Sequence, residues 1–203
     1  MDSAFVATKG NLMRAKASLA LSKQGFELMD KKRSILIMEL MSLIDRADKI
    51  QNNIDSTYSQ AYEALMRANL DLGLHMVEKY CRTIPKEESL TIKLRSVMGV
   101  EIPEVSIADP SSTPYYGMMD SSPSLDEALK KFEQVKLFTV ELAEVENSAY
   151  RLAMSIKKTQ KRANALTNIL IPRYQKLVKD IQISLEEKER EEFIRLKVIK
   201  HKK

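Results

Sequence analysis

The chain reads LIMELMSLIDRADKIQNNIDSTYSQAYEALMRANLDL over residues 36–72, a stretch with neither proline nor glycine. Apolar or small residues recur in it at steps of three and four, averaging about 3.6, which is the period of a helix with one buried stripe. The stripe consists of Leu36, Leu40, Leu43, Ala47, Ile50, Ile54, Tyr58, Ala61, Leu65, Ala68 and Leu72. It extends backward through Phe26, Leu19 and Leu12. We therefore predict a helix over residues 9–82, on the order of 110 Å long.

A second long helix is predicted over residues 124–203. Ser124 and Glu127 have the spacing of a capping box at its start. Its stripe, with a mean step near 3.5 that favours supercoiling, runs through Leu125, Leu129, Phe132, Val135, Phe138, Leu142, Val145, Ala149, Leu152, Ile156, Ala163, Leu166 and Leu170. Pro172 is expected to kink or locally break this helix. The pattern then resumes at Leu177, Ile181, Leu185, Phe193, Leu196 and Ile199.

Two matching stripes on one chain favour burial against each other. We predict a mostly α fold, a long antiparallel two-helix coiled coil whose bend is formed by the middle of the chain. A bend between residues 82 and 123 would place Arg33 opposite Pro172. Pairing between two chains is the competing interpretation, and the similar lengths of the stripes favour pairing within one chain.

The middle of the chain, residues 85–123, predicts a short β-hairpin followed by a proline-rich loop. Residues 89–107 read SLTIKLRSVMGVEIPEVSI, an alternating pattern rich in β-branched residues. A two-residue turn at Met98-Gly99 would pair Lys93 with Glu104 on one face. The other face would then form an apolar hairpin core from Leu90, Ile92, Leu94, Val105 and Ile107.

The residues that would carry chemistry are sparse. The 203-residue chain has two histidines, His75 and His201, on different segments, and one cysteine, Cys81. These residues assemble neither a catalytic triad nor a zinc site, and no phosphate-binding glycine motif occurs. We therefore expect a non-catalytic protein without cofactor or metal. A single cysteine and the absence of an apolar spanning segment favour a cytosolic protein that does not insert into membranes.

Positive charge is concentrated in two stretches near the chain ends. The net charge is only +5, yet residues 157–179 carry seven basic residues and no acid, and residues 9–33 carry seven basic residues against two acids. Such a collar suits phosphates or acidic protein loops. Nucleic acid is disfavoured because the aromatic residues of a single-strand binder and the basic fork of a DNA-reading zipper are missing. We expect a protein partner.

Several motifs, in order, resemble the D subunit of V-type and archaeal A-type rotary ATPases. The N-terminal motif is Thr8-Lys9, Leu12, Gly25 and Lys31-Lys32-Arg33. The C-terminal motif is KKTQKRANAL at residues 157–166, followed by Ile171-Pro172-Arg173 and the tail LEEKEREEFIRLKVIK at residues 185–200. The sequence departs from the family pattern at Ala7, Lys161, Ala163 and Thr167.

The resemblance implies the central shaft of a rotary motor that couples ATP hydrolysis or synthesis to ion transport. Its terminal half would turn inside the ring of catalytic A and B subunits. Its other half would hold the F subunit, with the middle of the rod (about residues 40–60 and 130–150) and the β-hairpin as the expected site, and would rest on the C/d-type subunit that caps the membrane rotor. The chain would then lie peripherally at the cytoplasmic face of the membrane.

Within that role we expect the basic collar to be an electrostatic bearing against the catalytic ring. Its expected contact residues are Lys31, Lys32, Arg33, Lys158, Lys161, Arg162, Asn164 and Arg173. Two other functions remain open from the sequence: a coiled-coil stalk or adaptor of another ATPase machine, such as the flagellar export type, and a nucleic-acid-binding coiled coil.

Overall fold

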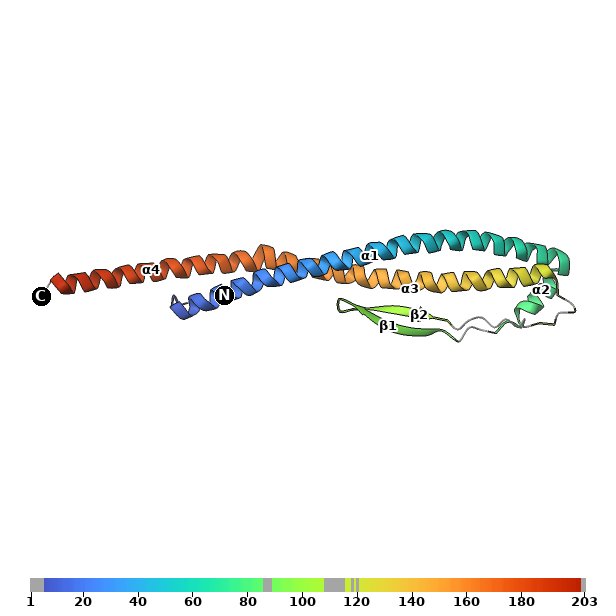
Figure 1. Cartoon of the computed structure of the whole chain (residues 1–203), viewed down its shortest axis with the longest axis horizontal. Helices are drawn as coiled ribbons and strands as arrows, with labels where there is room; N and C mark the ends of the chain where they lie inside the picture. Colours follow the sequence, from blue (N-terminus) through green and yellow to red (C-terminus); the bar gives the residue numbers. More distant parts are fainter. Residues whose placement is uncertain (1–5, 86–88, 108–115, 118, 120, 202–203) are drawn as a thin grey trace. The chain divides into compact units, whose positions relative to one another are not determined.

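The computed structural model describes residues 6–85, 89–107, 116, 117, 119 and 121–201. Its elements are α1 (Lys9–Leu72), α2 (Leu74–Cys81), β1 (Thr91–Val97), β2 (Val100–Ser106), α3 (Pro123–Ala165), the π-helix η2 (Leu166–Leu170) and α4 (Ile171–His201) (Figure 1). The predicted fold class, long helices with one short β-hairpin, is confirmed. No helix in the described ranges carries an apolar run long enough to span a membrane.

The chain divides into two compact units, which are described separately. Unit 1 contains Met1–Ile35 and Ile156–Lys203, and unit 2 contains Leu36–Ser155. Helix α1 contributes residues to both units, and the β-hairpin belongs to unit 2.

The core of unit 2 is the antiparallel seam between α1 and α3. Ile50 and Ile54 of α1 are buried against Val145 of α3, with Leu43, Ala47, Tyr58, Phe138 and Leu142 packed around them. Outside this cluster, the Arg46 guanidinium donates to the Glu141 carboxylate at 3.0 Å from Nε. The apolar contacts are those that the sequence pattern predicts for two such helices, and the ion pair is added to them.

Helix α1 ends ten residues earlier than expected because of Gly73. Gly73 has a φ of 80° and a ψ of 148°, an extended conformation at positive φ that breaks the helix and that side chains with a Cβ rarely adopt. The short helix α2 then carries Val77 back onto Ala68 and Leu125, and the Tyr80 and Tyr116 rings pack beside them. The seam consequently has a different register from the predicted one: Ser124 Oγ donates to Asp71 at 2.8 Å.

Tyr116 closes this end of unit 2. Its hydroxyl donates to Asp126 Oδ1 at 2.5 Å, and its ring lies 5.3 Å from that of Tyr80. Burial, followed by the hydrogen bond to the Asp126 carboxylate, raises the pKa of the Tyr116 phenol well above its ordinary value. The phenol is therefore a neutral donor throughout the physiological range.

The start of α3 corrects the predicted capping box. Ser122, not Ser124, is the capping residue: its Oγ accepts the Leu125 N–H at 3.3 Å, and Pro123 occupies the first helical position. Proline suits that position because its N–H would be unpaired there in any residue. Ser124 is thereby released to bond Asp71 across the seam.

A pair of glycine substitutions tests the helix end. Gly73→Ala should lower the free energy of unfolding by about 1 kcal/mol, because alanine is strained at positive φ although no atom lies within 4 Å of its Cβ position. Gly25→Ala is the matched control inside α1, where a Cβ would make an ordinary 3.9 Å contact with Leu166. It should stabilise the chain by roughly 0.5–1 kcal/mol. Urea unfolding followed by circular dichroism measures both; equal effects of the two variants would contradict the assignment.

The β-hairpin has the predicted register and turn. Ile92 pairs with Val105, Lys93 with Glu104 and Leu94 with Pro103. Met98 and Gly99 both have positive φ, 50° and 76°, as the two-residue turn matching strand twist requires.

The predicted apolar hairpin core is wrong. Ile92 and Leu94 are 62% and 61% exposed, Leu90 is also exposed, and Val105 and Ile107 are only partly buried. The buried side chain of the hairpin is Ile102, on the opposite face of the strand pair. The sequence identified which residues share a face but could not say which face would be covered by other elements.

Unit 1 pairs the start of α1 with α4. Ala15 is buried against Val178 and Ile181, with Leu12, Leu177 and Leu185 around them. Lys9 forms an ion pair with Glu189 at 3.0 Å.

The local break expected near Pro172 takes the form of a π-helix between α3 and α4. The π-helix η2 precedes the proline, and the Ile171 N–H bonds to Leu166 O, five residues back. A π-turn inserts one extra residue into a helix. From Ala163 to Val178, both buried, the chain advances 15 residues, slightly more than the roughly 14.4 residues of four α-helical turns. The π-turn thus absorbs the extra length and keeps both residues on the seam.

Candidate functional site

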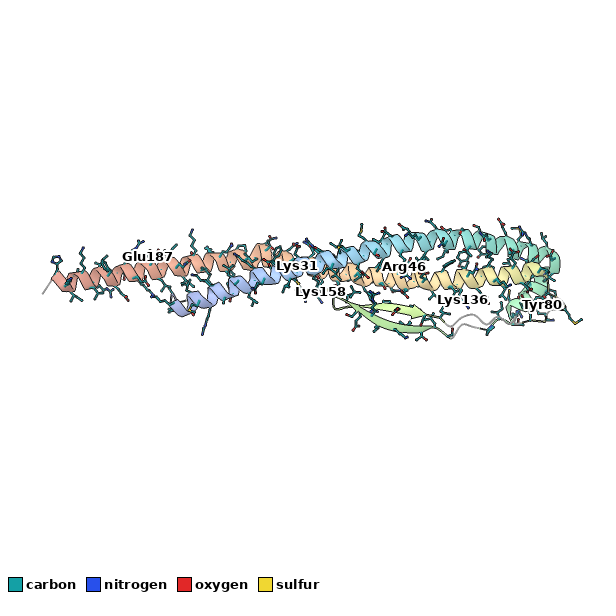
Figure 2. The ribbon with its side chains drawn as sticks, in the orientation of Figure 1. Lys31, Arg46, Tyr80, Lys136, Lys158 and Glu187 are labelled. Atoms are coloured by element: carbon teal, nitrogen blue, oxygen red, sulfur yellow. The ribbon has the colours of Figure 1, made fainter. Side chains whose placement is uncertain are left out.

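The predicted bearing residues all lie in unit 1, on both of the helical segments that pack there. Lys31, Lys32 and Arg33 are on α1, and Lys158, Lys161, Arg162 and Asn164 are on the last turns of α3. Arg173 follows on α4, beyond the π-helix. Figure 2 labels Lys31 on α1 and Lys158 on α3.

The structure separates Arg33 from the others, because its guanidinium is held inside the unit. Nη1 donates to Gln160 Oε1 at 2.6 Å, and Nη2 pairs with Asp30 at 2.6 Å. Gln160 in turn donates to Asn164 at 2.8 Å. Arg33 and Asn164 are thus members of a polar clip between α1 and α3. This clip also corrects the register, since Arg33 lies opposite Gln160 and not Pro172.

The remaining cations form an open surface. Lys31, Lys158, Lys161 and Arg162 are exposed, and within the described ranges no acidic side chain pairs with any of them. Lys32 is half-buried, and Arg173 is exposed but engaged in a contact of its own. We call the four unpaired residues the basic surface. Unpaired and hydrated, these charges are available to an acidic or polar partner.

A second surface, which the sequence analysis did not predict to be exposed, lies at the end of α4. Helix α4 continues past the start of α1 (Figure 1), and beyond Leu185 its apolar side chains are exposed. They are Phe193, Ile194, Leu196, Val198 and Ile199. We call this segment the α4 tail. The sequence prediction treated Phe193, Leu196 and Ile199 as one buried stripe.

The α4 tail has no single apolar face. At about 100° of rotation per residue, its five apolar side chains point in directions that leave no gap around the helix wider than about 100°. Charged residues such as Glu192, Arg195 and Lys197 lie between them, so the tail presents apolar and charged side chains on every side. Part of the signal was present in the sequence, since Ile194 and Val198 fall off the stripe; that α1 stops short of this length of helix follows only from the observed register, in which Lys9 pairs with Glu189.

Known proteins are similar in sequence to this chain over almost its whole length. The family model that describes the D subunit of ATP synthase matches residues 11–201. The chain belongs to the ATP synthase D-subunit family. It is 43% identical over 195 residues to the D subunit of the V-type ATP synthase of Thermotoga neapolitana, covering 96% of each chain.

Archaeal relatives are similar along almost the same length. The D subunit of the A-type ATP synthase of Pyrococcus abyssi is 34% identical over 196 residues, covering 95% of this chain and 92% of the relative. That of Methanobrevibacter smithii is 37% identical over 200 residues, covering 95% and 85%. The resemblance drawn from the motifs is confirmed, and this member of the D-subunit family is a component of an ATP synthase complex.

Proposed function

We propose that this chain is the central rotor shaft of a V/A-type ATPase, transmitting torque between the ring of catalytic A and B subunits and the membrane rotor. ATP hydrolysis or synthesis is thereby coupled to ion transport, and the chain itself performs no catalysis. The observation that carries the proposal is the α4 tail. Apolar side chains that point in all directions from one helix, between charged ones, suit contacts on every side within a ring, whereas an adaptor that docks on one face needs only one stripe.

The basic surface supports the same orientation. The exposed cations, which have no acidic partner among the described residues, give attraction to acidic or polar ring groups without the tight grip of an apolar interface. A shaft must leave each angular position after reaching it, so weak screened contacts suit its flank better than hot spots of burial. In this role Lys31, Lys158, Lys161 and Arg162 contact the ring, while Arg33 and Asn164 hold the two helices together.

The seam of unit 2 supplies the resistance to slip that torque requires. Interlocked side chains such as Ile50, Ile54 and Val145 prevent one helix from sliding along the other. The ion pair between Arg46 and Glu141 adds a second lateral tie.

The F subunit is placed by this proposal on unit 2. Ile37, Met41 and Ile44 of α1 are exposed at the i, i+4, i+7 spacing of a helix face that docks in a partner's groove. The cap subunit of the membrane rotor is placed at the bend, where Leu70 and Leu74 are exposed. The complex lies at the cytoplasmic face of the membrane.

The single cysteine offers a direct test of rotation. Cys81 at the end of α2 is exposed, so a bead can be attached there through a maleimide linker without another substitution. With the catalytic subunits of the purified complex fixed to a surface, ATP should turn the bead in one direction. A Cys81→Ser complex should lose the beads that are attached through this chain. ATP hydrolysis with a stationary, correctly attached bead would rule out the shaft.

A further inference from the structure

The two edges of the β-hairpin differ in whether other described residues bond to their backbone groups. The outer edge of β2 is covered by three polar side chains of α3. The Val105 N–H donates to Glu144 Oε2 at 2.7 Å. Ser148 Oγ donates to the Pro103 carbonyl at 3.4 Å, and Arg151 Nη1 donates to the Glu101 carbonyl at 3.1 Å. Glu144, Ser148 and Arg151 recur at helical spacing, so one face of α3 satisfies one strand edge.

These bonds also show which backbone groups of β1 point outward. In an antiparallel pair, residues alternate between those bonded to the partner strand and those whose N–H and C=O point away from it. Glu101, Pro103 and Val105 point away from β1, and their register partners are Ser96, Leu94 and Ile92. The same three β1 residues therefore direct their backbone groups to the opposite edge. Proline at position 103 agrees, since only an outward position can lack an N–H.

The edge of β1 is open within the part of the chain that the structure describes. No hydrogen bond joins the outward backbone groups of Ile92, Leu94 or Ser96 to another described residue. Side chains from Thr91 to Ser96 are all exposed. A seven-residue strand with one uncovered edge is a template for pairing with another strand.

The side chains beside this edge specify what could pair with it. Ile92 and Leu94 stand on one face of the strand, and Lys93 and Arg95 on the other. Arg95 lies opposite Ile102, so its charge has no acidic neighbour directly across the hairpin. An added strand that alternates acidic and apolar residues would place its carboxylates beside the two cations and its apolar side chains beside Ile92 and Leu94.

We propose that β1 accepts an extended segment of a partner protein by strand addition, with alternating acidic and apolar residues in that segment. A second copy of this chain fits poorly, because antiparallel pairing of two β1 strands about Leu94 places Lys93 beside Arg95 of the other copy. Like charges directly opposite each other are destabilising. The proposal stands on the strand geometry alone and does not depend on the rotor function.

Hydrogen exchange with a model peptide tests it on the full-length chain. The probe is an end-capped heptapeptide alternating valine and glutamate, and the readout is amide exchange by NMR. At a peptide concentration about ten times Kd, exchange of the Ile92, Leu94 and Ser96 amides should slow about tenfold. The Lys93 and Arg95 amides already bond to β2 and should change little. A peptide with lysine in place of glutamate should have no effect.

Variants of both partners separate strand addition from simple contact. Leu94→Pro removes only an outward N–H, as Pro103 does across the pair, and should abolish the protection; Leu94→Ala should retain most of it. N-methylation of the peptide on the alternate amides that face β1 should also abolish it, whereas methylation of the other set should not. The comparison of the two N-methylated peptides still tests the proposal if Leu94→Pro disturbs the hairpin.

Three outcomes would overturn the proposal. The first is unchanged exchange of the outward amides at saturating peptide. The second is slow exchange of these amides before peptide is added, which would mean that the chain covers its own edge. The third is equal binding of both N-methylated peptides.

Discussion

Leu152→Ala should lower the free energy of unfolding by about 3 kcal/mol, among the largest stability effects expected from truncating one side chain in this chain. Leu152 lies on α3 and is 0% exposed. Truncation removes its transfer free energy and leaves a cavity that a two-helix seam cannot easily fill from a second layer. Such a loss is a large share of the roughly 5–15 kcal/mol that keeps a typical domain folded.

Leu70→Ala is the matched control. Leu70 lies within α1 and is 82% exposed. Both substitutions replace leucine by alanine within a helix, so their effects on helix propensity are the same. The control should change the free energy by less than about 0.5 kcal/mol. Urea titration of both variants by circular dichroism measures the difference. Similar midpoints for the two variants would mean that the α1–α3 seam of unit 2 contributes little to stability.

Neutralising the basic surface should produce the largest functional effect. The variant replaces Lys31, Lys158, Lys161 and Arg162 by glutamine, and leaves Arg33 in place because it holds α1 to α3. If each cation contributes about 0.5 kcal/mol to the ring contact, the loss is about 2 kcal/mol, or roughly thirtyfold in the equilibrium constant for seating the shaft. Ion transport per ATP hydrolysed should fall, while the helical content of the chain should not.

The control removes the same charges from unit 2. Lys49, Arg67, Lys79 and Lys130 are exposed residues of that unit, and replacing them by glutamine also removes three lysines and one arginine. Both complexes are reconstituted into vesicles, and ATP hydrolysis and ion uptake are measured together. Raising the salt concentration should weaken coupling in the unmodified complex and change the basic-surface variant much less, because its screened contacts are already gone. Equal coupling in the two variants at low salt would contradict the bearing hypothesis.

The β-hairpin shows how far local patterns reach. The alternation in residues 89–107 predicted the turn at Met98-Gly99 and every observed strand pair, because register follows from the turn and from the two-residue period of a strand. The same pattern led to the wrong core. Whether Ile92 or Ile102 is buried depends on which face and edge meet α3, and α3 begins more than fifteen residues after β2 ends.

The candidate functional site also combines features that the sequence predicted with features that only the structure showed. Its cations were found from the sequence, because residues 157–179 contain seven basic residues and no acidic one. That Arg33 is bonded to Gln160 and Asp30 could not be found there, since the register of the seam depends on where α1 ends. Gly73 ends it, and a glycine near the end of a long apolar pattern is compatible with either a continuing or a terminating helix.

The sequence by itself determined the two long helical segments, the strand pair between them and the family to which the chain belongs, because each follows from residue periodicity or motif order along the chain. The tertiary structure alone decided which residues face each other across the seam and, among the residues that it describes, which cations stay unpaired and which strand edge and helix end remain uncovered. Those features depend on contacts between residues far apart in the chain, where a helix end displaced by ten residues changes every pairing that follows it.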